Sequence, residues 1–192
     1  AMDYFLRLLD AMRERELELG HAVDLPHDAL PRVSHVDRLF RFWVEHRSVC
    51  SACKRKVVEY EPRWSWRVSL AGFETEEAQV QELFLHSCAA VDRSYPCQRC
   101  KSIQVHRTQQ RLASLPNVFI VHVDRETSPE SSASMGSIQV EDQLSFPDLG
   151  SNLELASVMF ASRRSLCASR CGGGDFWLFD AGKRSHCLGP VS

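Results

Sequence analysis

The chain has 192 residues and a formal net charge of −2, and 44% of its residues are hydrophobic while 25% are charged. These proportions are typical of a globular domain long enough to bury a real core, and the near-neutral charge argues against a domain-wide footprint for nucleic acid. The sequence contains no apolar run of about 18 residues, so no membrane-spanning helix is predicted. No secretory leader is expected, and without one the eight cysteines favour a reducing cytosol or nucleus over a disulfide scaffold.

The first third of the chain predicts one helix followed by strands. Apolar residues recur at helical spacing from about Met2 to Leu19, and Gly20 is expected to end this helix. Residues 39–44 are typical of a strand. Residues 57–70 alternate in polarity and predict a strand whose core-facing side carries four apolar residues, Trp64, Trp66, Val68 and Leu70.

The middle of the chain predicts a helix and two more strands. Thr75 is expected to cap a helix that reaches about Ser87. Residues 103–112 alternate in polarity, as a strand does. The apolar segment 118–123 predicts a central strand buried on both faces, and we therefore expect His122 to have a core role.

The last part of the chain is expected to consist mainly of strands. Residues 127–136 are Ser-rich and predict a mobile surface loop. Residues 153–160 and 176–180 predict two strands, and residues 172–174 (Gly-Gly-Gly) predict a turn before the second. With no internal repeat, the whole pattern predicts a mostly β chain of the α+β class.

Two C-x-x-C steps are the most informative feature of the sequence. Cys50 and Cys53 form the first, Cys97 and Cys100 form the second, and 43 residues separate them. Two sulfurs at this spacing chelate one metal from a tight turn, so two such turns complete a tetrahedral site for one structural zinc ion. A redox pair is the alternative for either step, but two pairs in one chain favour zinc. Four thiolates leave no open position for a catalytic water, so this zinc is expected to organise structure.

The remaining cysteines have no assigned role and are expected to be small apolar side chains: Cys88, Cys167, Cys171 and Cys187. An alternative is a second metal site made by Cys167, Cys171, His186 and Cys187, although the C-x-x-x-C spacing is less favoured. Residues 54–56 (Lys-Arg-Lys) follow the first cysteine pair. We expect them to be a solvated basic tip, because three residues do not make a nucleic-acid-binding stripe.

The order of these segments resembles the ubiquitin-specific protease family of papain-like cysteine proteases. The family's motifs are similar to Asp3–Asp10 (D-Y-F-L-R-L-L-D), Leu115–Arg125 (L-P-N-V-F-I-V-H-V-D-R), Phe146–Pro147 with Leu153–Leu155, and Trp177–Asp180 (W-L-F-D). The two C-x-x-C pairs match the zinc-tipped fingers of that family. The resemblance runs from Asp3 to about Leu188.

This resemblance implies a single domain over residues 1–192, with the α+β, papain-like ubiquitin-specific-protease fold. Residues 1–20 would be the helix that ends the thumb, residues 40–112 the zinc-bearing fingers and residues 113–192 the β-rich palm, with most of the thumb missing. The lobes of this fold enclose a groove for a globular ubiquitin-like body and its extended C-terminal tail.

The catalytic triad that the resemblance implies is incomplete in this sequence. In the family a cysteine attacks the isopeptide carbonyl, a histidine activates the cysteine, and an Asp or Asn orients the histidine. The cysteine box precedes the helix that begins at Met2, so we expect this chain to lack it. Leu166 or a neighbour stands where the histidine of a G-H-Y step belongs, and leucine cannot transfer a proton. Only Asp180 matches a triad member, as a remnant without a catalytic role.

We therefore expect a catalytically inactive module that acts as a protein-interaction scaffold or binds a ubiquitin-like protein. We expect its partner to be a protein in a larger assembly, and we expect no membrane partner. Its expected location is the cytoplasm or nucleus. One alternative is the C-terminal part of an active cysteine deubiquitinase whose nucleophile lies outside this chain; the missing histidine counts against it. The other is a zinc-ribbon nucleic-acid-binding domain, which the near-neutral charge disfavours.

Overall fold

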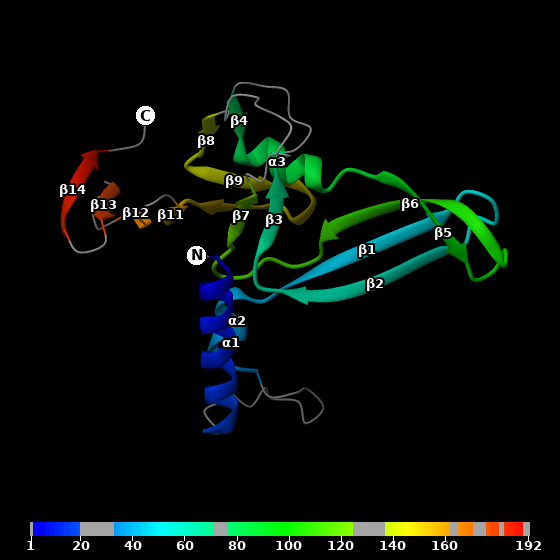
Figure 1. Ribbon diagram of the computed structural model, residues 1–192, viewed down its shortest axis with the longest axis horizontal. Helices are drawn as coiled ribbons and strands as arrows, with labels where there is room; N and C mark the ends of the chain where they lie inside the picture. Colours follow the sequence, from blue (N-terminus) through cyan, green and yellow to red (C-terminus); the bar gives the residue numbers. More distant parts are fainter. Residues whose placement is uncertain are drawn as a thin grey trace.

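The computed structural model describes residues 2–19, 33–70, 77–124, 137–161, 165–170, 176–180 and 183–189, and side chains only between residues 4 and 158 (Figure 1). The helices in these ranges are α1 (Met2–Glu18), α2 (His35–Phe40), α3 (Val80–Ser87) and the 3-10 helix η1 (Pro147–Leu149). The strands are β1 (Phe42–Cys50), β2 (Lys56–Arg63), β3 (Trp66–Ser69), β4 (Glu77–Gln79), β5 (Val91–Cys97), β6 (Ser102–Leu112), β7 (Val121–Asp124), β8 (Ser137–Gln139), β9 (Gln143–Phe146), β10 (Ser151–Glu154), β11 (Ser157–Ala161), β12 (Ser165–Arg170), β13 (Phe176–Asp180) and β14 (Lys183–Gly189). No helix in this part of the chain is long and apolar enough to cross a membrane.

Strands β1, β2, β5 and β6 form an antiparallel sheet that projects away from the centre of the molecule (Figure 1). The strand order is β2-β1-β6-β5, so two hairpins, β1–β2 and β5–β6, are joined through β1 and β6. Each C-x-x-C step forms the turn of one hairpin, as the sequence predicted. Because Cys50 on β1 lies opposite His106 on β6, the two turns meet at the far end of this sheet. We call this sheet the fingers.

The hydrophobic core lies where the fingers join the parallel strand pair β3–β7 and helix α3. Trp66 and Phe42 are fully buried there, and they stack with their ring centroids 6.2 Å apart. Phe84 from α3 packs against Trp66 at 5.1 Å. The indole N–H of Trp66 donates to Ser87 Oγ at 2.7 Å, so the polar atom of this buried ring also has a partner. Burial of these aromatic rings, together with the aliphatic side chains around them, stabilises the centre of the molecule.

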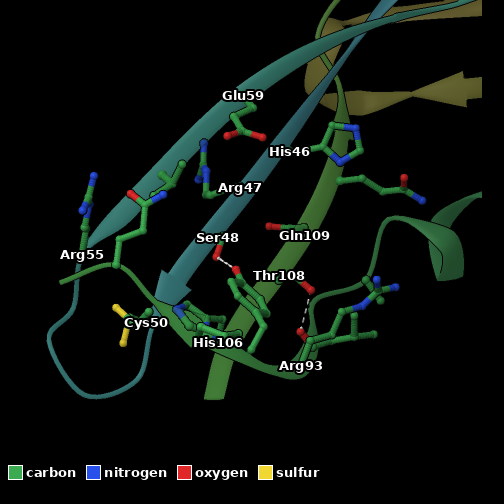
Figure 2. A pocket seen from close by; sticks show the side chains of 18 of the residues that line it. His46, Arg47, Ser48, Cys50, Arg55, Glu59, Arg93, His106, Thr108 and Gln109 are labelled. Atoms are coloured by element: carbon green, nitrogen blue, oxygen red, sulfur yellow. Dashed lines mark hydrogen bonds between the residues drawn. The ribbon is translucent and has the colours of Figure 1, made fainter. Parts of the chain in front are cut away.

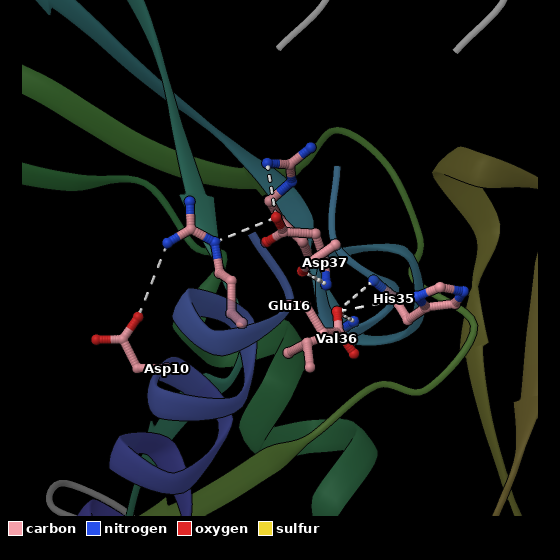
Figure 3. A network of polar contacts seen from close by, with 8 residues as sticks. Asp10, Glu16, His35, Val36 and Asp37 are labelled. Atoms are coloured by element: carbon pink, nitrogen blue, oxygen red, sulfur yellow. Dashed lines mark hydrogen bonds and ion pairs between the residues drawn. The ribbon is translucent and has the colours of Figure 1, made fainter. Parts of the chain in front are cut away.

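Helix α1 is held against α2 by polar contacts (Figure 3). Arg13 Nε donates to Asp37 Oδ2 at 3.1 Å, and the Asp37 side chain is only 1% exposed. Glu16 Oε2 accepts hydrogen bonds from the first N–H groups of α2, at 2.7 Å from His35 and 3.4 Å from Val36. A carboxylate at a helix N-terminus satisfies unpaired donors and complements the helix dipole. These contacts fix α1 relative to the short helix that leads into the fingers.

Several sequence predictions agree with the structure. Helix α1 covers the predicted span to within one residue, and the predicted strands at residues 103–112 and 176–180 are β6 and β13. Trp66 and Val68 share a buried face of β3, as their alternation predicted. Two predicted segments, the turn at 172–174 and the loop at 127–136, lie outside the described residues.

Three boundaries predicted before the second cysteine pair were wrong. Residues 39–40 belong to α2, which Ser34 caps by accepting a hydrogen bond from the Asp37 N–H at 2.9 Å. The predicted strand 57–70 is two strands, β2 and β3, which pair with different sheets, and Trp64 lies between them under the Arg13 guanidinium. Helix α3 begins at Val80 and not at Thr75, because residues 77–79 pair with β8 as strand β4. Thr75 itself lies outside the described residues.

Two later strand predictions also require correction. Residues 153–160 fall into two strands, β10 and β11, which belong to different sheets. The predicted central strand 118–123 begins only at Val121, and its four residues are half-buried. Val121 and Val123 pack on the core, whereas His122 lies opposite the exposed Arg67 in the strand register. The predicted core role of His122 is therefore wrong, because alternate residues of a strand face opposite sides.

Candidate functional site

Four cysteine sulfurs lie together at the tip of the fingers. They belong to Cys50, Cys53, Cys97 and Cys100, and all four lie within 4.8 Å of one another. The Cys50 and Cys100 sulfurs are 3.9 Å apart, and those of Cys53 and Cys97 are 3.7 Å apart. A tetrahedral zinc ion with Zn–S bonds of about 2.3 Å requires sulfurs about 3.8 Å apart, so the geometry fits one such ion. This cluster brings together the four residues that the sequence singled out.

The two turns that carry these cysteines have the same backbone geometry. The carbonyl of Cys50 accepts a hydrogen bond from the Lys54 N–H at 3.0 Å, and the carbonyl of Cys97 accepts one from the Lys101 N–H at 2.9 Å. Lys54 and Lys101 both have φ of 58°, in the left-handed region that side chains with a Cβ rarely adopt. This backbone conformation is unfavourable for lysine, and it occurs at both equivalent positions. We infer that the turn adopts it because it brings the cysteine sulfurs together.

The thiols in this cluster differ in acidity. The backbone N–H of Cys100 donates to the Cys97 sulfur and lowers the pKa of that thiol to about 5, and the His106 side chain acts in the same direction. Hydrogen bonding with the Cys53 side chain, together with burial, raises the pKa of the Cys100 thiol to about 12. A bound divalent metal would supply the charge that four neighbouring thiolates need.

His106 supports the cluster through a side-chain hydrogen bond with Cys97, although no pattern in the sequence singles it out. It is 5% exposed, its Nδ1 lies 3.0 Å from the Gln104 carbonyl, and its ring stacks on Tyr95 at 3.8 Å with an interplanar angle of 10°. The carbonyl contact requires a proton on Nδ1. The Tyr95 hydroxyl in turn contacts Ser48 Oγ. A histidine at alternating spacing in a strand gives no sequence signal of this role.

One face of the fingers lines a groove of about 1110 Å³ (Figure 2). Arginines outnumber acids among its described lining residues: Arg47, Arg55, Arg63 and Arg93 contribute to it, whereas Glu59 is the one acidic contributor. Neutral polar groups such as Ser48 and Thr108 lie between them. The Glu61 carboxylate, nearby on β2, accepts a hydrogen bond from Arg63 at 2.8 Å, and that bond lowers the Glu61 pKa.

Asp180, the residue that the sequence matches to a triad member, lies in the sheet β11-β12-β13-β14. Asp180 ends β13, and the residue opposite it on β12 is Leu166. His186 on β14 lies opposite Leu178, on the other side of β13. The sequence of β12, residues 165–170, contains no histidine. The backbone register therefore places Leu166 beside Asp180.

The remaining cysteines are spread through the structure. Cys88 follows α3, is half-buried against the core, and burial raises its thiol pKa. A raised pKa disfavours the thiolate that a nucleophile needs. Cys167 lies on β12 and Cys187 on β14, so β13 separates their backbones. Cys171 lies outside the described residues.

The chain belongs to the ubiquitin carboxyl-terminal hydrolase family, whose model matches residues 1–168. This match confirms the resemblance to ubiquitin-specific proteases and the α+β fold class that it implied. Comparison with curated proteins found no match.

Two solved structures show the same fold. One is the SAGA Ubp8/Sgf11/Sus1/Sgf73 DUB module bound to ubiquitin aldehyde, with a TM-score of 0.75 and 15% sequence identity over 97% of this chain. The other is the SAGA DUB module with a substituted Ubp8 and the same three partner proteins, bound to monoubiquitin, with a TM-score of 0.67 and 16% identity over 91% of this chain. The alignments cover 45% and 42% of those chains, so this chain spans less than half the length of either.

Proposed function

We propose that this chain is a catalytically inactive ubiquitin-specific-protease-like module that acts as a protein-interaction scaffold or binds a ubiquitin-like protein. Residues 1–192 would form one domain: a thumb-end helix at 1–20, fingers at 40–112 and a palm at 113–192. The module would work in the cytoplasm or nucleus as part of a larger protein assembly. The similar solved chains belong to a multi-protein DUB module. This analogy of fold supports a place in a larger protein assembly.

The observation that carries the proposal is the pairing of Leu166 with Asp180. Acyl transfer by a cysteine needs a group that takes the thiol proton and later gives a proton to the leaving amine. A leucine side chain can neither accept nor donate a proton, and the carboxylate of a triad only orients the histidine. His186 is the histidine nearest in register, but it pairs with the far side of β13.

We further propose that the four-cysteine cluster binds one zinc ion with a structural role. Zinc favours thiolate ligands in a tetrahedral arrangement, and four protein ligands leave no position for water or substrate. The ion would hold the two hairpin turns together. It would take no part in chemistry.

A hydrolysis assay tests the loss of activity. The whole chain, purified with its metal, is incubated with a fluorogenic amide of the ubiquitin C-terminus, and we expect no turnover above that of buffer. Turnover that disappears in a Cys88→Ser, Cys167→Ser, Cys171→Ser or Cys187→Ser variant would overturn the proposal. Turnover that disappears in His186→Ala would show that β14 supplies the missing base.

A binding titration tests the choice between a scaffold and a ubiquitin reader. We expect labelled ubiquitin to bind weakly or not at all. Saturable binding at low micromolar concentration, lost on substitutions in the fingers or palm, would instead establish a reader of ubiquitin.

A further inference from the structure

The fingers carry a strong positive charge within a chain that is slightly negative overall. Residues 42–63 and 91–112 contain ten Lys and Arg residues and four Asp and Glu residues, which gives a net charge of +6, whereas the whole chain has −2. A zinc ion with four thiolates would contribute −2, and the fingers would then keep +4. This asymmetry is invisible in the overall composition.

The acids of the fingers leave much of this positive charge uncompensated. Glu45 pairs with Arg47 at 2.7 Å and Glu61 pairs with Arg63 at 2.8 Å, so two of the four acids are already neutralised. The two acids that remain face a larger number of basic side chains.

Six exposed basic residues gather at the two turns and along the groove, and none forms an ion pair among the described residues: Lys54, Arg55, Lys56, Arg93, Arg99 and Lys101. We call these six residues the basic tip. Arg107 is exposed as well, but it lies opposite Asp92 in the strand register and is not counted with them.

The basic tip is assembled by the fold from two separate segments. Residues 54–56 follow the first cysteine pair, Arg99 and Lys101 lie in and after the second, and the four sulfurs hold both turns together. Arg55 and Arg93 flank the groove from opposite edges of the sheet, since one precedes β2 and the other lies on β5 (Figure 2). By themselves, residues 54–56 are too few to make a binding stripe. The fold adds Arg93, Arg99 and Lys101, so that six basic residues gather at the two turns and along the groove.

The groove between these arginines is better suited to a protein surface than to nucleic acid. Glu59 lies among its lining residues, and its carboxylate needs a hydrogen-bond donor, which the peptide N–H groups of a protein surface supply and a phosphate backbone does not. The Thr108 hydroxyl already donates to the Val91 carbonyl at 3.0 Å, so it offers a partner only an acceptor, which also suits the N–H groups of a protein surface. Tyr95 is the one Phe, Tyr or Trp among the described lining residues, and His106 covers one face of its ring.

We propose that the basic tip and its groove bind an acidic protein surface, that is, a partner that presents clustered Asp and Glu side chains. This inference rests on the proposed function as a protein-interaction module and names the chemistry of the partner. Arginine forks match carboxylate geometry, and clustered charges both steer encounter and exclude basic partners.

The test uses the zinc-loaded whole chain and fluorescence anisotropy. The probe is a fluorescein-labelled poly-glutamate peptide of about 20 residues, titrated at low and at physiological salt. We expect saturable binding that weakens with salt. The double variant Arg55→Glu with Arg93→Glu should raise Kd at least about tenfold, because each reversal replaces an attraction by a repulsion.

The matched control is the double variant Arg7→Glu with Arg67→Glu, which changes the net charge equally at exposed arginines outside the fingers. It should change Kd by less than about twofold. Zinc content of about one per chain verifies that both variants are folded at the tip. Absence of saturable binding, or equal loss in both variants, would overturn the inference.

A second arm distinguishes carboxylate from phosphate. Duplex DNA of about 20 base pairs, which carries a denser charge, should bind more weakly than poly-glutamate at the same salt concentration. Tighter binding of the duplex would overturn the inference in favour of a nucleic-acid module. Isopeptidase activity in the assay above would overturn the proposed function without changing either anisotropy result, so the two failures are distinguishable.

Discussion

Lys54 and Lys101 occupy equivalent left-handed positions, one after each C-x-x-C step. This conformation costs a residue with a Cβ about 1–2 kcal/mol, whereas glycine adopts it freely. Their N–H groups close the two turns by donating to Cys50 and Cys97. The strain is therefore tolerated because the turn positions the sulfurs.

Substitutions at Lys101 should separate backbone strain from side-chain effects. We expect Lys101→Gly to raise the free energy of unfolding by about 0.5–1 kcal/mol, and Lys101→Val to lower it by at least about 1 kcal/mol. Urea unfolding of the zinc-loaded chain measures both. Arg99→Gly, in the same turn without a positive φ, should not stabilise; a loss of stability in Lys101→Gly would mean that the lysine side chain itself contributes.

The Glu61 carboxylate pairs with Arg63, and the hydrogen bond lowers its pKa. A lowered folded-state pKa means that the pair contributes stability above the unfolded carboxyl pKa, and that this contribution is lost as pH falls through the folded value. We expect Arg63→Ala to raise the Glu61 pKa toward its ordinary value, as followed by NMR titration of the side-chain carboxyl. Arg47→Ala, which removes the partner of Glu45, should leave the Glu61 pKa unchanged. An unchanged Glu61 pKa in Arg63→Ala would contradict this assignment.

Helix α3 shows how an element obtains its start from a distant residue. Its N-cap residue, Gln79, makes no side-chain cap. Instead the Glu141 carboxylate accepts from the Val80 N–H at 3.2 Å and the Gln81 N–H at 3.1 Å. Such an acidic group satisfies two unpaired donors and complements the helix dipole.

We expect Glu141→Ala to lower the free energy of unfolding by about 1–2 kcal/mol, as loss of a helix cap does. Glu141→Gln keeps an acceptor and should cost less. Thermal unfolding followed by circular dichroism measures the difference, with Glu14→Ala on the exposed side of α1 as the control. If Glu141→Ala and the control have equal effects, the contact does not cap the helix.

At the scale of the molecule, the fingers and the central core differ in how they are stabilised. Strands β2 and β5 are exposed along almost their whole length. In the distal half of the fingers the buried residues that the structure describes are Cys50, Cys97 and His106, all at the four-cysteine cluster. The core around Trp66 needs no metal. The ion should therefore stabilise the fingers and not the centre.

Removal of zinc with a chelator should unfold the fingers first. Hydrogen exchange should become fast at amides of β5 and β6, while amides of β3 and α3 stay protected. Cys97→Ser should behave as the chelated protein does, and Cys88→Ser should retain about one zinc per chain. Simultaneous loss of protection in fingers and core would show that the domain unfolds as one unit.

The sequence by itself determined those features that depend on short spacing. The four-cysteine cluster could be predicted because each pair must lie within one turn, and helix α1 and strand β6 could be predicted because their apolar residues repeat at a regular period. The family could also be identified, since its motifs are short and ordered. Local chemistry is sufficient in each of these cases.

Tertiary structure alone decided the features that join distant segments. The strand predicted at 57–70 breaks because its two halves pair with different sheets, and α3 starts late because its first residues pair with β8 and its cap comes from Glu141. The basic tip likewise exists only where the four sulfurs bring two turns together. No pattern within a single segment records such contacts, because their partners lie many residues away and meet only when the sheet register forms.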